Sequence, residues 1–388
     1  MSYATGGDLS ASGLLFLGMQ CLGTILGKDG PHEQALKARG EQACGTAYIK
    51  REQRVYIYNA EVMPCSSTLS IAHIKNDRCV LTVGARLMLT VGQERHDPME
   101  INVGEKLYAV TFSANGEYLL SGGYNGVRVW RVKDREEIAT MKTKAVWSLA
   151  VSKDSKWIAA GTLWGDVHVW DANYKQVFAH KEDSASINAV DFSPDSTRLV
   201  SASSNNTAAI WDIATLERVH TLRHEDKVIA ATYSPQGDRI ATTTKDSVLR
   251  IYDSKDGRLL VTIETTVTPW HNTGLVWFNN HLLVISDGQI KQVEASTGLA
   301  ISEWPVPDIN VHSCTALPKH GEFIAYSAKR TVTFWDMVTH TQLGLIQRPQ
   351  DIRSIALSPD DLFIAIGEEG GEIIIENLSR ITVSSMYC

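Results

Sequence analysis

The sequence predicts an all-β protein built from tandem modules. Residues 187–212 and 228–253 carry the same pattern, in which three short segments of alternating apolar and polar residues are separated by turn residues. Trp211 and Tyr252 hold the same place in the third segments of the two copies. Short alternating segments bounded by Ser-Pro, Asn, Asp or Gly are typical of β-strands, and a period of about 40 residues is typical of repeat proteins.

The third segment recurs along most of the chain. Its anchors are Thr90, Trp130, Trp170, Trp211, Tyr252, Val293, Trp335 and Ile375. Successive anchors repeat at intervals of about 40 to 42 residues, which is the length of one small β-sheet module. We therefore expect eight modules between residue 65 and residue 388. Residues 55–60 resemble a further third segment, but Tyr58 lies too close to Thr90 to complete a module and is assigned to a partial unit.

Each full module contains four candidate strands. In one module they are residues 107–112, 118–121, 127–130 and 137–141. Four short antiparallel strands are too small to be stable alone, and modules of this kind bury their faces by stacking around a ring whose closure limits exposed sheet edges. The sequence therefore predicts a β-propeller, with eight blades favoured and seven as the alternative.

The last module is short of sequence for a fourth strand after Asn377, where residues 381–384 offer only a weak candidate. We expect residues 47–60 to pair with a terminal blade and to help close the ring.

The N-terminal residues lie outside the repeat. Residues 14–26 form a run without charge, which is too short to span a bilayer and is not preceded by a basic region. We expect this run to dock on the folded body, with a membrane anchor as the alternative. Residues 31–39 predict a short helix that begins at Pro31 and stops at Gly40. The predicted organisation is an appendage over residues 1–43 and a propeller over residues 44–388.

Composition limits the class of protein and of partner. The chain has 388 residues, of which 44% are apolar and 21% charged, and a formal net charge of -7 without a run of lysine or arginine. Nucleic acid is therefore not expected as the main partner, because affinity for phosphate comes from clustered basic residues. The six cysteines form no Cys-x-x-Cys pair, which argues against structural zinc and a disulfide framework. We expect reduced thiols in an intracellular protein of the cytoplasm or nucleus.

Two recurring motifs carry a family resemblance. The first is the Trp-Asp dipeptide at the end of the third segment, and the second is a Ser-Pro turn, usually followed by Asp, between the first and second segments. The dipeptides are Trp170-Asp171, Trp211-Asp212 and Trp335-Asp336, and the turns are Ser193-Pro194-Asp195, Ser234-Pro235 and Ser358-Pro359-Asp360. In both features the sequence resembles the WD-repeat propellers. It departs from their pattern at Thr90, which lacks the dipeptide, and in the absence of the Gly-His pair from every module.

One module contains residue types that could be mistaken for a catalytic triad. His224, Thr242 and Asp246 could be a nucleophile and its partners, but the resemblance implies that they form a structural network with Tyr252 inside one blade. It also implies that Trp130, Trp170, Trp211 and Trp335 are core residues. No module offers a second carboxylate, a glycine-rich phosphate loop or a metal-spaced cluster, so we predict no enzyme activity, no cofactor and no metal site.

A partner-binding surface is the remaining functional prediction. The resemblance places partner contacts in the loops before the first strand and between the second and third strands, where the aromatic residues are Tyr108, Tyr124, Trp147, Trp164 and Trp270. Trp164 holds the position that Asp246 holds in its own module. For Trp147 and Trp164, packing against a neighbouring blade and exposure to a partner are both open. Trp and Tyr dominate interface hot spots, so we expect these residues to form the partner-facing patch.

The predicted function is a non-catalytic scaffold for other proteins or peptides, acting as a monomer or as a subunit of a larger complex. A membrane-associated coat or trafficking component is the alternative, suggested by residues 14–26.

Overall fold

The structure is a computed structural model that describes residues 43–51, 54–62, 69–75, 78–83, 98–182, 184–264, 274–286, 289–306, 315–318 and 321–378. The chain divides into two compact units, Met1–Asp97 and Pro98–Cys388. This division falls at Asp97, whereas the sequence places it at residue 43. The apolar run of residues 14–26, the predicted helix of residues 31–39 and the weak strand candidate of residues 381–384 lie outside the described residues.

The first unit contains two antiparallel hairpins. One pairs β1 (Ala43–Arg51) with β2 (Arg54–Val62), and the other pairs β3 (Leu69–Lys75) with β4 (Arg78–Val83). The expectation that residues 47–60 pair with a terminal blade is therefore wrong. These residues pair with each other across the first hairpin, in which Ala47 lies opposite Tyr58.

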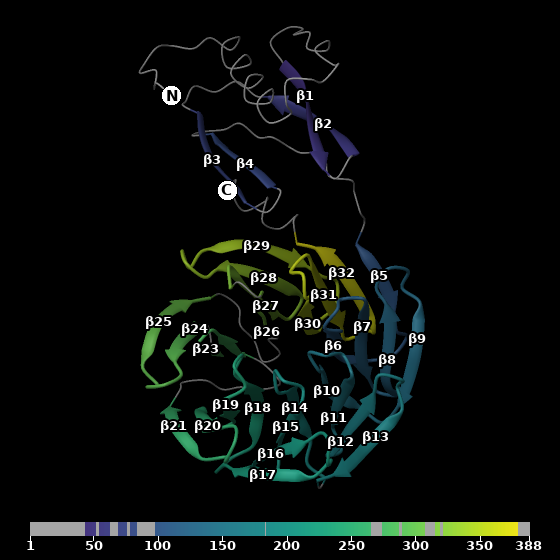
Figure 1. The fold of residues 1–388 in the computed structure, drawn as a ribbon, viewed down its shortest axis with the longest axis vertical. Helices are drawn as coiled ribbons and strands as arrows, with labels where there is room; N and C mark the ends of the chain where they lie inside the picture. Colours follow the sequence, from purple (N-terminus) through teal and green to yellow (C-terminus); the bar gives the residue numbers. More distant parts are fainter. Residues whose placement is uncertain are drawn as a thin grey trace. The chain divides into compact units, whose positions relative to one another are not determined.

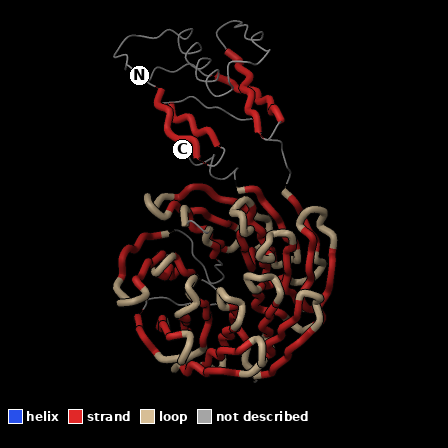
Figure 2. Tube along the Cα trace, viewed as in Figure 1, coloured by secondary structure: helices blue, strands red, loops and turns tan. Residues whose placement is uncertain are grey.

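The second unit is a ring of seven four-stranded antiparallel sheets, or blades (Figure 1). Its described residues form strands and loops only (Figure 2), which confirms the all-β prediction. Blade 1 contains β6 (Leu107–Phe112), β7 (Tyr118–Gly123), β8 (Gly126–Arg131) and β9 (Glu137–Lys142). Blade 2 contains β10 (Val146–Val151), β11 (Trp157–Thr162), β12 (Asp166–Asp171) and β13 (Gln176–Lys181). Blade 3 contains β14 (Ile187–Phe192), β15 (Arg198–Ser203), β16 (Thr207–Asp212) and β17 (Arg218–Arg223).

The ring continues with four further blades. Blade 4 contains β18 (Val228–Tyr233), β19 (Arg239–Thr244), β20 (Val248–Asp253) and β21 (Leu259–Glu264). Blade 5 contains β22 (Leu275–Phe278), β23 (His281–Ser286), β24 (Gln289–Glu294) and β25 (Ala300–Pro305). Blade 6 contains β26 (Thr315–Ala316), β27 (Phe323–Ala328), β28 (Thr331–Asp336) and β29 (Gln342–Gln347). Blade 7 contains β30 (Ile352–Leu357), β31 (Phe363–Glu368), β32 (Glu372–Asn377) and β5 (Met99–Asn102).

Blade 7 is completed by a strand from the beginning of the second unit. Strand β5 pairs with β32, and Ile101 lies opposite Ile373. The favoured count of eight blades is therefore wrong, and the alternative of seven is what the structure shows. The module expected around Thr90 does not add a blade among the described strands, because β3 and β4 form a separate hairpin and residues 99–102 serve the last blade. Thr90 itself is outside the described residues.

The core consists of apolar clusters packed between neighbouring blades. Trp130, Trp170 and Trp211 are buried as predicted, and Trp211 lies between blades, with its ring 5.4 Å from that of Phe178. Trp335 differs, because it is only half-buried and its indole nitrogen Nε1 has no hydrogen-bond partner among the described residues. The fourth residue of its blade's second strand is Tyr326, where blades 1 and 3 have a serine.

The Ser-Pro-Asp motif forms the predicted turn between first and second strands. The Ser193 hydroxyl donates to the Asp195 carboxylate over 2.6 Å and accepts a hydrogen bond of 2.9 Å from the backbone N–H of Arg198. A serine side chain thus satisfies a backbone donor that the tight turn would otherwise leave without a partner.

Candidate protein-binding face

The residues that resembled a catalytic triad are buried inside blade 4. His224 Nε2 lies 2.9 Å from Thr242 Oγ1 and 3.1 Å from the Tyr252 hydroxyl, and Nδ1 lies 3.1 Å from the carbonyl oxygen of Leu222. Burial lowers the pKa of His224 to about 4 and raises the pKa of Tyr252 to about 12. A neutral, fully engaged imidazole beside a buried hydroxyl has no access to substrate, so this arrangement serves stability.

The fourth predicted member of this network does not join it as expected. Asp246 is exposed, and its carboxylate accepts a hydrogen bond from the Thr244 hydroxyl rather than from His224. The backbone carbonyl of Leu222 occupies the role expected for the acid. The sequence could not reveal this partner, because every residue offers a backbone carbonyl.

Two tryptophans of the core have serine partners in the neighbouring strand of the same blade. Trp130 Nε1 donates to Ser121 Oγ and Trp211 Nε1 donates to Ser201 Oγ, each over 2.9 Å. These indoles have their one polar atom satisfied inside the sheet. They are structural residues and are not available to a partner.

The aromatic residues predicted to bind a partner divide into two pairs. Tyr124 and Trp164 are 58% and 53% exposed, which is unusually high for large aromatic side chains. Tyr108 and Trp147 are half-buried, and their ring centroids lie 5.1 Å apart with planes inclined by 39°. Trp270 lies outside the described residues.

Main-chain hydrogen bonds connect the loops of Tyr124 and Trp164 with the loops that precede β6 and β10, the strands of Tyr108 and Trp147. The N–H of Tyr124 bonds to the carbonyl of Lys106 over 3.3 Å, and the N–H of Ala145 bonds to the carbonyl of Tyr124 over 2.7 Å. The N–H of Leu163 then bonds to the carbonyl of Ala145 over 2.9 Å. These loops therefore lie next to one another at one end of blades 1 and 2. We call this end of the two blades the aromatic face, and it carries Tyr108, Tyr124, Trp147 and Trp164.

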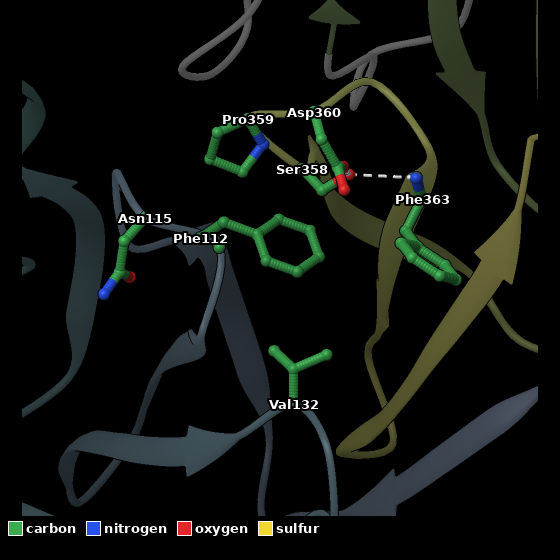
Figure 3. Close-up of a pocket in the computed structure, with 8 residues that line it drawn as sticks. Phe112, Asn115, Val132, Ser358, Pro359, Asp360 and Phe363 are labelled. Atoms are coloured by element: carbon green, nitrogen blue, oxygen red, sulfur yellow. Dashed lines mark hydrogen bonds between the residues drawn. The ribbon is translucent and has the colours of Figure 1, made fainter. Parts of the chain in front are cut away.

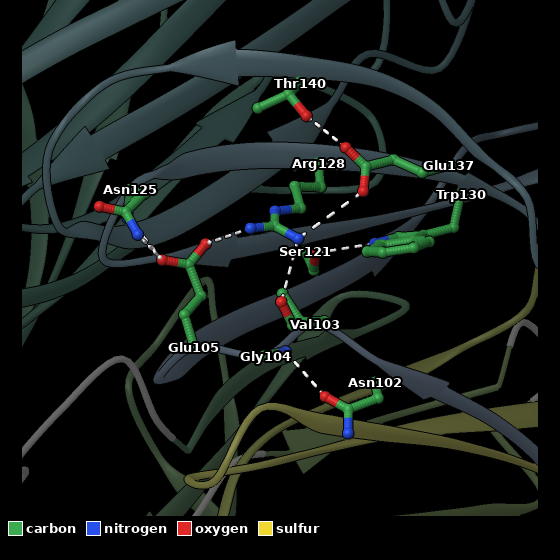
Figure 4. A network of polar contacts seen from close by, with 10 residues as sticks. All are labelled: Asn102, Val103, Gly104, Glu105, Ser121, Asn125, Arg128, Trp130, Glu137 and Thr140. Atoms are coloured by element: carbon green, nitrogen blue, oxygen red, sulfur yellow. Dashed lines mark hydrogen bonds and ion pairs between the residues drawn. The ribbon is translucent and has the colours of Figure 1, made fainter.

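A polar network holds the turn beside Tyr124 (Figure 4). The Glu105 carboxylate accepts a hydrogen bond of 2.9 Å from the N–H of Asn125 and lies 3.4 Å from the Arg128 guanidinium. Arg128 also donates to the carbonyl oxygen of Val103 over 3.0 Å. Several such bonds hold this turn in one conformation. The turn therefore loses little conformational entropy when Tyr124 binds a partner.

A small pocket lies at the other end of the blade 1 strands, where blade 1 meets blade 7 (Figure 3). Its lining is Phe112, Asn115, Gly116, Val132, Ser358, Pro359, Asp360 and Phe363. Its volume of about 220 Å³ is below the ~300 Å³ at which ligand pockets usually begin. The pocket is therefore a small gap at the seam between blades 1 and 7.

Within the described ranges, no group of three or more His, Cys, Asp or Glu side chains could hold a metal ion. In the same part of the chain, no helix is long and apolar enough to cross a membrane.

Four segments of the chain match the family model of the WD domain, G-beta repeat, over residues 102–131, 135–171, 173–212 and 216–253. The last three matches each span the fourth strand of one blade and the first three strands of the next, so the four matches together cover blades 1 to 3 and the first three strands of blade 4 in the seven-bladed ring. The second unit is a WD-repeat β-propeller. The resemblance in the Trp-Asp dipeptides and Ser-Pro turns is confirmed.

Known proteins align with parts of this WD-repeat chain. It is 30% identical to Periodic tryptophan protein 2 of Arabidopsis thaliana over 165 residues, which are 40% of this chain and 18% of that protein. It is 30% identical to a subunit of Chromatin assembly factor 1 from Gallus gallus over 152 residues, 39% of this chain and 24% of that protein. Over 315 residues it is 22% identical to Eukaryotic translation initiation factor 3 subunit I of Aspergillus terreus, covering 73% of this chain and 88% of that protein. The chain thus spans about a fifth to a quarter of the length of the first two relatives.

Proposed function

We propose that this WD-repeat protein is a non-catalytic scaffold that binds a partner protein or peptide through the aromatic face. The observation that carries the proposal is the exposure of Tyr124 and Trp164 on adjacent blades. Scattered apolar residues on a protein surface need no explanation, but large aromatics grouped on one surface are typical of interaction sites. Trp and Tyr side chains also contribute most to binding hot spots.

The half-buried pair beside these residues supports the same role. Tyr108 and Trp147 contact each other across the boundary between blades 1 and 2. They are the second residues of β6 and β10, so they add two aromatic rings to the end of the blades that carries Tyr124 and Trp164.

The names of the relatives fit membership of an intracellular complex. They include subunits of a chromatin assembly factor and of a translation initiation factor, and a U3 small nucleolar RNA-associated protein of Xenopus laevis. For this chain we propose the cytoplasm or nucleus as the location and proteins, rather than nucleic acid, as the direct partners.

Affinity purification from native cells, with quantitative mass spectrometry, tests the proposal. The double variant Tyr124→Ala/Trp164→Ala should lose partners that the unchanged protein retains. Leu299→Ala/Ile301→Ala is the matched control, because both residues are exposed apolar residues beside the start of β25 in blade 5. Identical partner sets for the unchanged protein and both variants, with equal melting temperatures, would exclude the aromatic face as the site.

A further inference from the structure

The aromatic face carries lysines without acidic partners. Lys142 ends β9 and lies opposite Gly126, close in sequence to Tyr124, and Lys144 precedes Ala145, which bonds to the Tyr124 carbonyl. Both lysines are exposed, and among the described residues neither pairs with a carboxylate. Both lysines therefore belong to the segment that is hydrogen-bonded through Ala145 to Tyr124 on one side and to Leu163, the residue before Trp164, on the other.

The carboxylates of blades 7 and 1 beside this face have cationic partners other than Lys142 and Lys144. Glu105 lies 3.4 Å and Glu137 3.6 Å from the Arg128 guanidinium, which the two acids share. Glu369 lies 2.8 Å from Arg353 and 3.2 Å from Lys106, and hydrogen bonding by Arg353 lowers its pKa.

On the blade 2 side, Glu182 lies 3.0 Å from Arg218, and its side chain is buried. Asp166 accepts a hydrogen bond from Thr162 and lies opposite Lys181 in the strand register. Among the described residues, Lys142 and Lys144 are therefore two cations of the aromatic face that pair with no carboxylate, in a chain whose formal net charge is -7.

Local charge, not net charge, governs binding at such a face. Interactions between exposed charges are screened over about 10 Å at ~0.1 M ionic strength. A bound peptide therefore responds to Lys142 and Lys144 more than to acids elsewhere on the ring.

We propose that the aromatic face binds an acidic peptide, whose carboxylates pair with Lys142 and Lys144 and whose apolar or aromatic side chain packs against Tyr124 and Trp164. This inference rests on the proposed function, because it names the class of partner for the same surface.

A nucleic acid is a poorer fit for the same charges. A polynucleotide needs a continuous basic track along its backbone. On the same end of the ring, the entry loop of blade 4 carries Glu225 and Asp226, and that of blade 7 carries Asp351. Two lysines between acidic loops can hold a short acidic segment but do not continue into a track.

Selection from a displayed library of short random peptides tests the inference, with Tyr124→Ala/Trp164→Ala used to remove peptides that bind elsewhere. The enriched sequences should contain more Asp and Glu than the starting library, together with an apolar residue. For the best synthetic peptide, fluorescence anisotropy should show that Lys142→Glu/Lys144→Glu raises Kd about tenfold at low salt. The difference should shrink at high salt, because screening weakens it.

The control variant is Lys133→Glu/Lys175→Glu, which makes the same charge change in the turns at the opposite end of blades 1 and 2. It should leave Kd within about twofold, since the charges lie beyond the screening distance. Melting temperatures of all variants should match that of the unchanged protein.

The contrary results distinguish a wrong class of partner from a wrong binding surface. Enrichment of neutral or basic peptides, or equal Kd values for both lysine variants, would overturn the preference for acidic peptides and leave the aromatic face as the site. A uridine oligonucleotide that binds more tightly than the best peptide through the same lysines would overturn it in favour of nucleic acid. Failure to enrich any peptide over the Tyr124→Ala/Trp164→Ala variant would overturn this inference, while the loss of partners in the affinity purification remains the test of the proposed function.

Discussion

Ile101 lies directly opposite Ile373 in an antiparallel pair that joins the first strand of the propeller to its last blade. Both side chains are buried in one apolar cluster with Leu107 of blade 1. Across the same seam, the N–H of Val110 donates to Ser354 Oγ over 3.0 Å. Strand pairing, apolar packing and a hydrogen bond therefore close the ring together. As a result, blade 7 has all four of its strands.

This closure predicts that Ile101→Ala destabilises the propeller by about 2 to 5 kcal/mol, because a buried isoleucine is replaced by a cavity. Glu100→Ala on the same strand is the control, since Glu100 is exposed and its loss should cost less than about 0.5 kcal/mol. Urea unfolding of both variants checks the difference. Equal effects would show that β5 is not held in blade 7.

Trp211→Ala should cost about 3 to 5 kcal/mol in the free energy of unfolding, through lost burial and a cavity. The indole packs against Phe178 and His180 of the preceding blade and donates to Ser201. Trp211→Phe retains an aromatic ring but leaves the Ser201 hydroxyl without its donor, so its cost should be smaller, about 1 to 3 kcal/mol. Denaturant unfolding orders the two variants, and a mild Trp211→Ala effect would contradict burial between blades.

The low pKa of His224 predicts a loss of stability in acid. The folded protein disfavours the charged imidazole, whereas the unfolded chain protonates it near its ordinary pKa of 6.5. The neutral histidine therefore contributes stability above about pH 6.5, and this is lost as the pH falls towards 4. Between pH 7 and 5 the loss from this one group should be about 2 kcal/mol. His224→Gln should reduce the dependence of the free energy of unfolding on pH between pH 7 and 5. An unchanged dependence would show that other groups cause the loss of stability.

Thr242→Val should destabilise the protein more than Asp246→Ala. The first change removes a hydroxyl 2.9 Å from a buried imidazole nitrogen and should cost about 1 to 3 kcal/mol. Asp246 is exposed and bonds only to Thr244 among the described residues, so its removal should cost less than about 1 kcal/mol. Thermal unfolding of both variants shows which change destabilises the protein more. A larger effect of Asp246→Ala would show that Asp246 does take part in the His224 network.

Glu368→Ala should be among the most damaging changes of charge. The Glu368 side chain is fully buried, and its carboxylate accepts a hydrogen bond of 2.6 Å from Arg348 Nε. Breaking a buried pair leaves an uncompensated charge at a cost of about 3 to 5 kcal/mol. Glu369→Ala removes the neighbouring, more exposed acid and should cost less than about 1 kcal/mol. The double variant Arg348→Met/Glu368→Leu removes both charges and should be more stable than Glu368→Ala. If it is not, the unpaired arginine does not cause the destabilisation by Glu368→Ala.

The sequence by itself determined the local features of the propeller. The spacing of Trp130, Trp170 and Trp211 predicted the repeat, because each strand carries its own alternation of apolar residues, and the family resemblance implied the burial of these indoles. The Ser193-Pro194-Asp195 turn could be predicted for the same reason, since its hydrogen bonds join residues close together in the chain.

Only the tertiary structure decided how these units are assembled. The number of blades depends on the pairing of Ile101 with Ile373, which no local pattern records, because either end of the chain could have supplied the last strand. The Leu222 carbonyl replaced Asp246 beside His224 because a backbone acceptor is present at every residue. Whether Trp164 is exposed or packed depends on the neighbouring blade, and the structure leaves more than half of its surface to solvent. Contacts between distant segments are set by the closure of the ring, and they decide which aromatic side chains are buried in the fold and which are exposed.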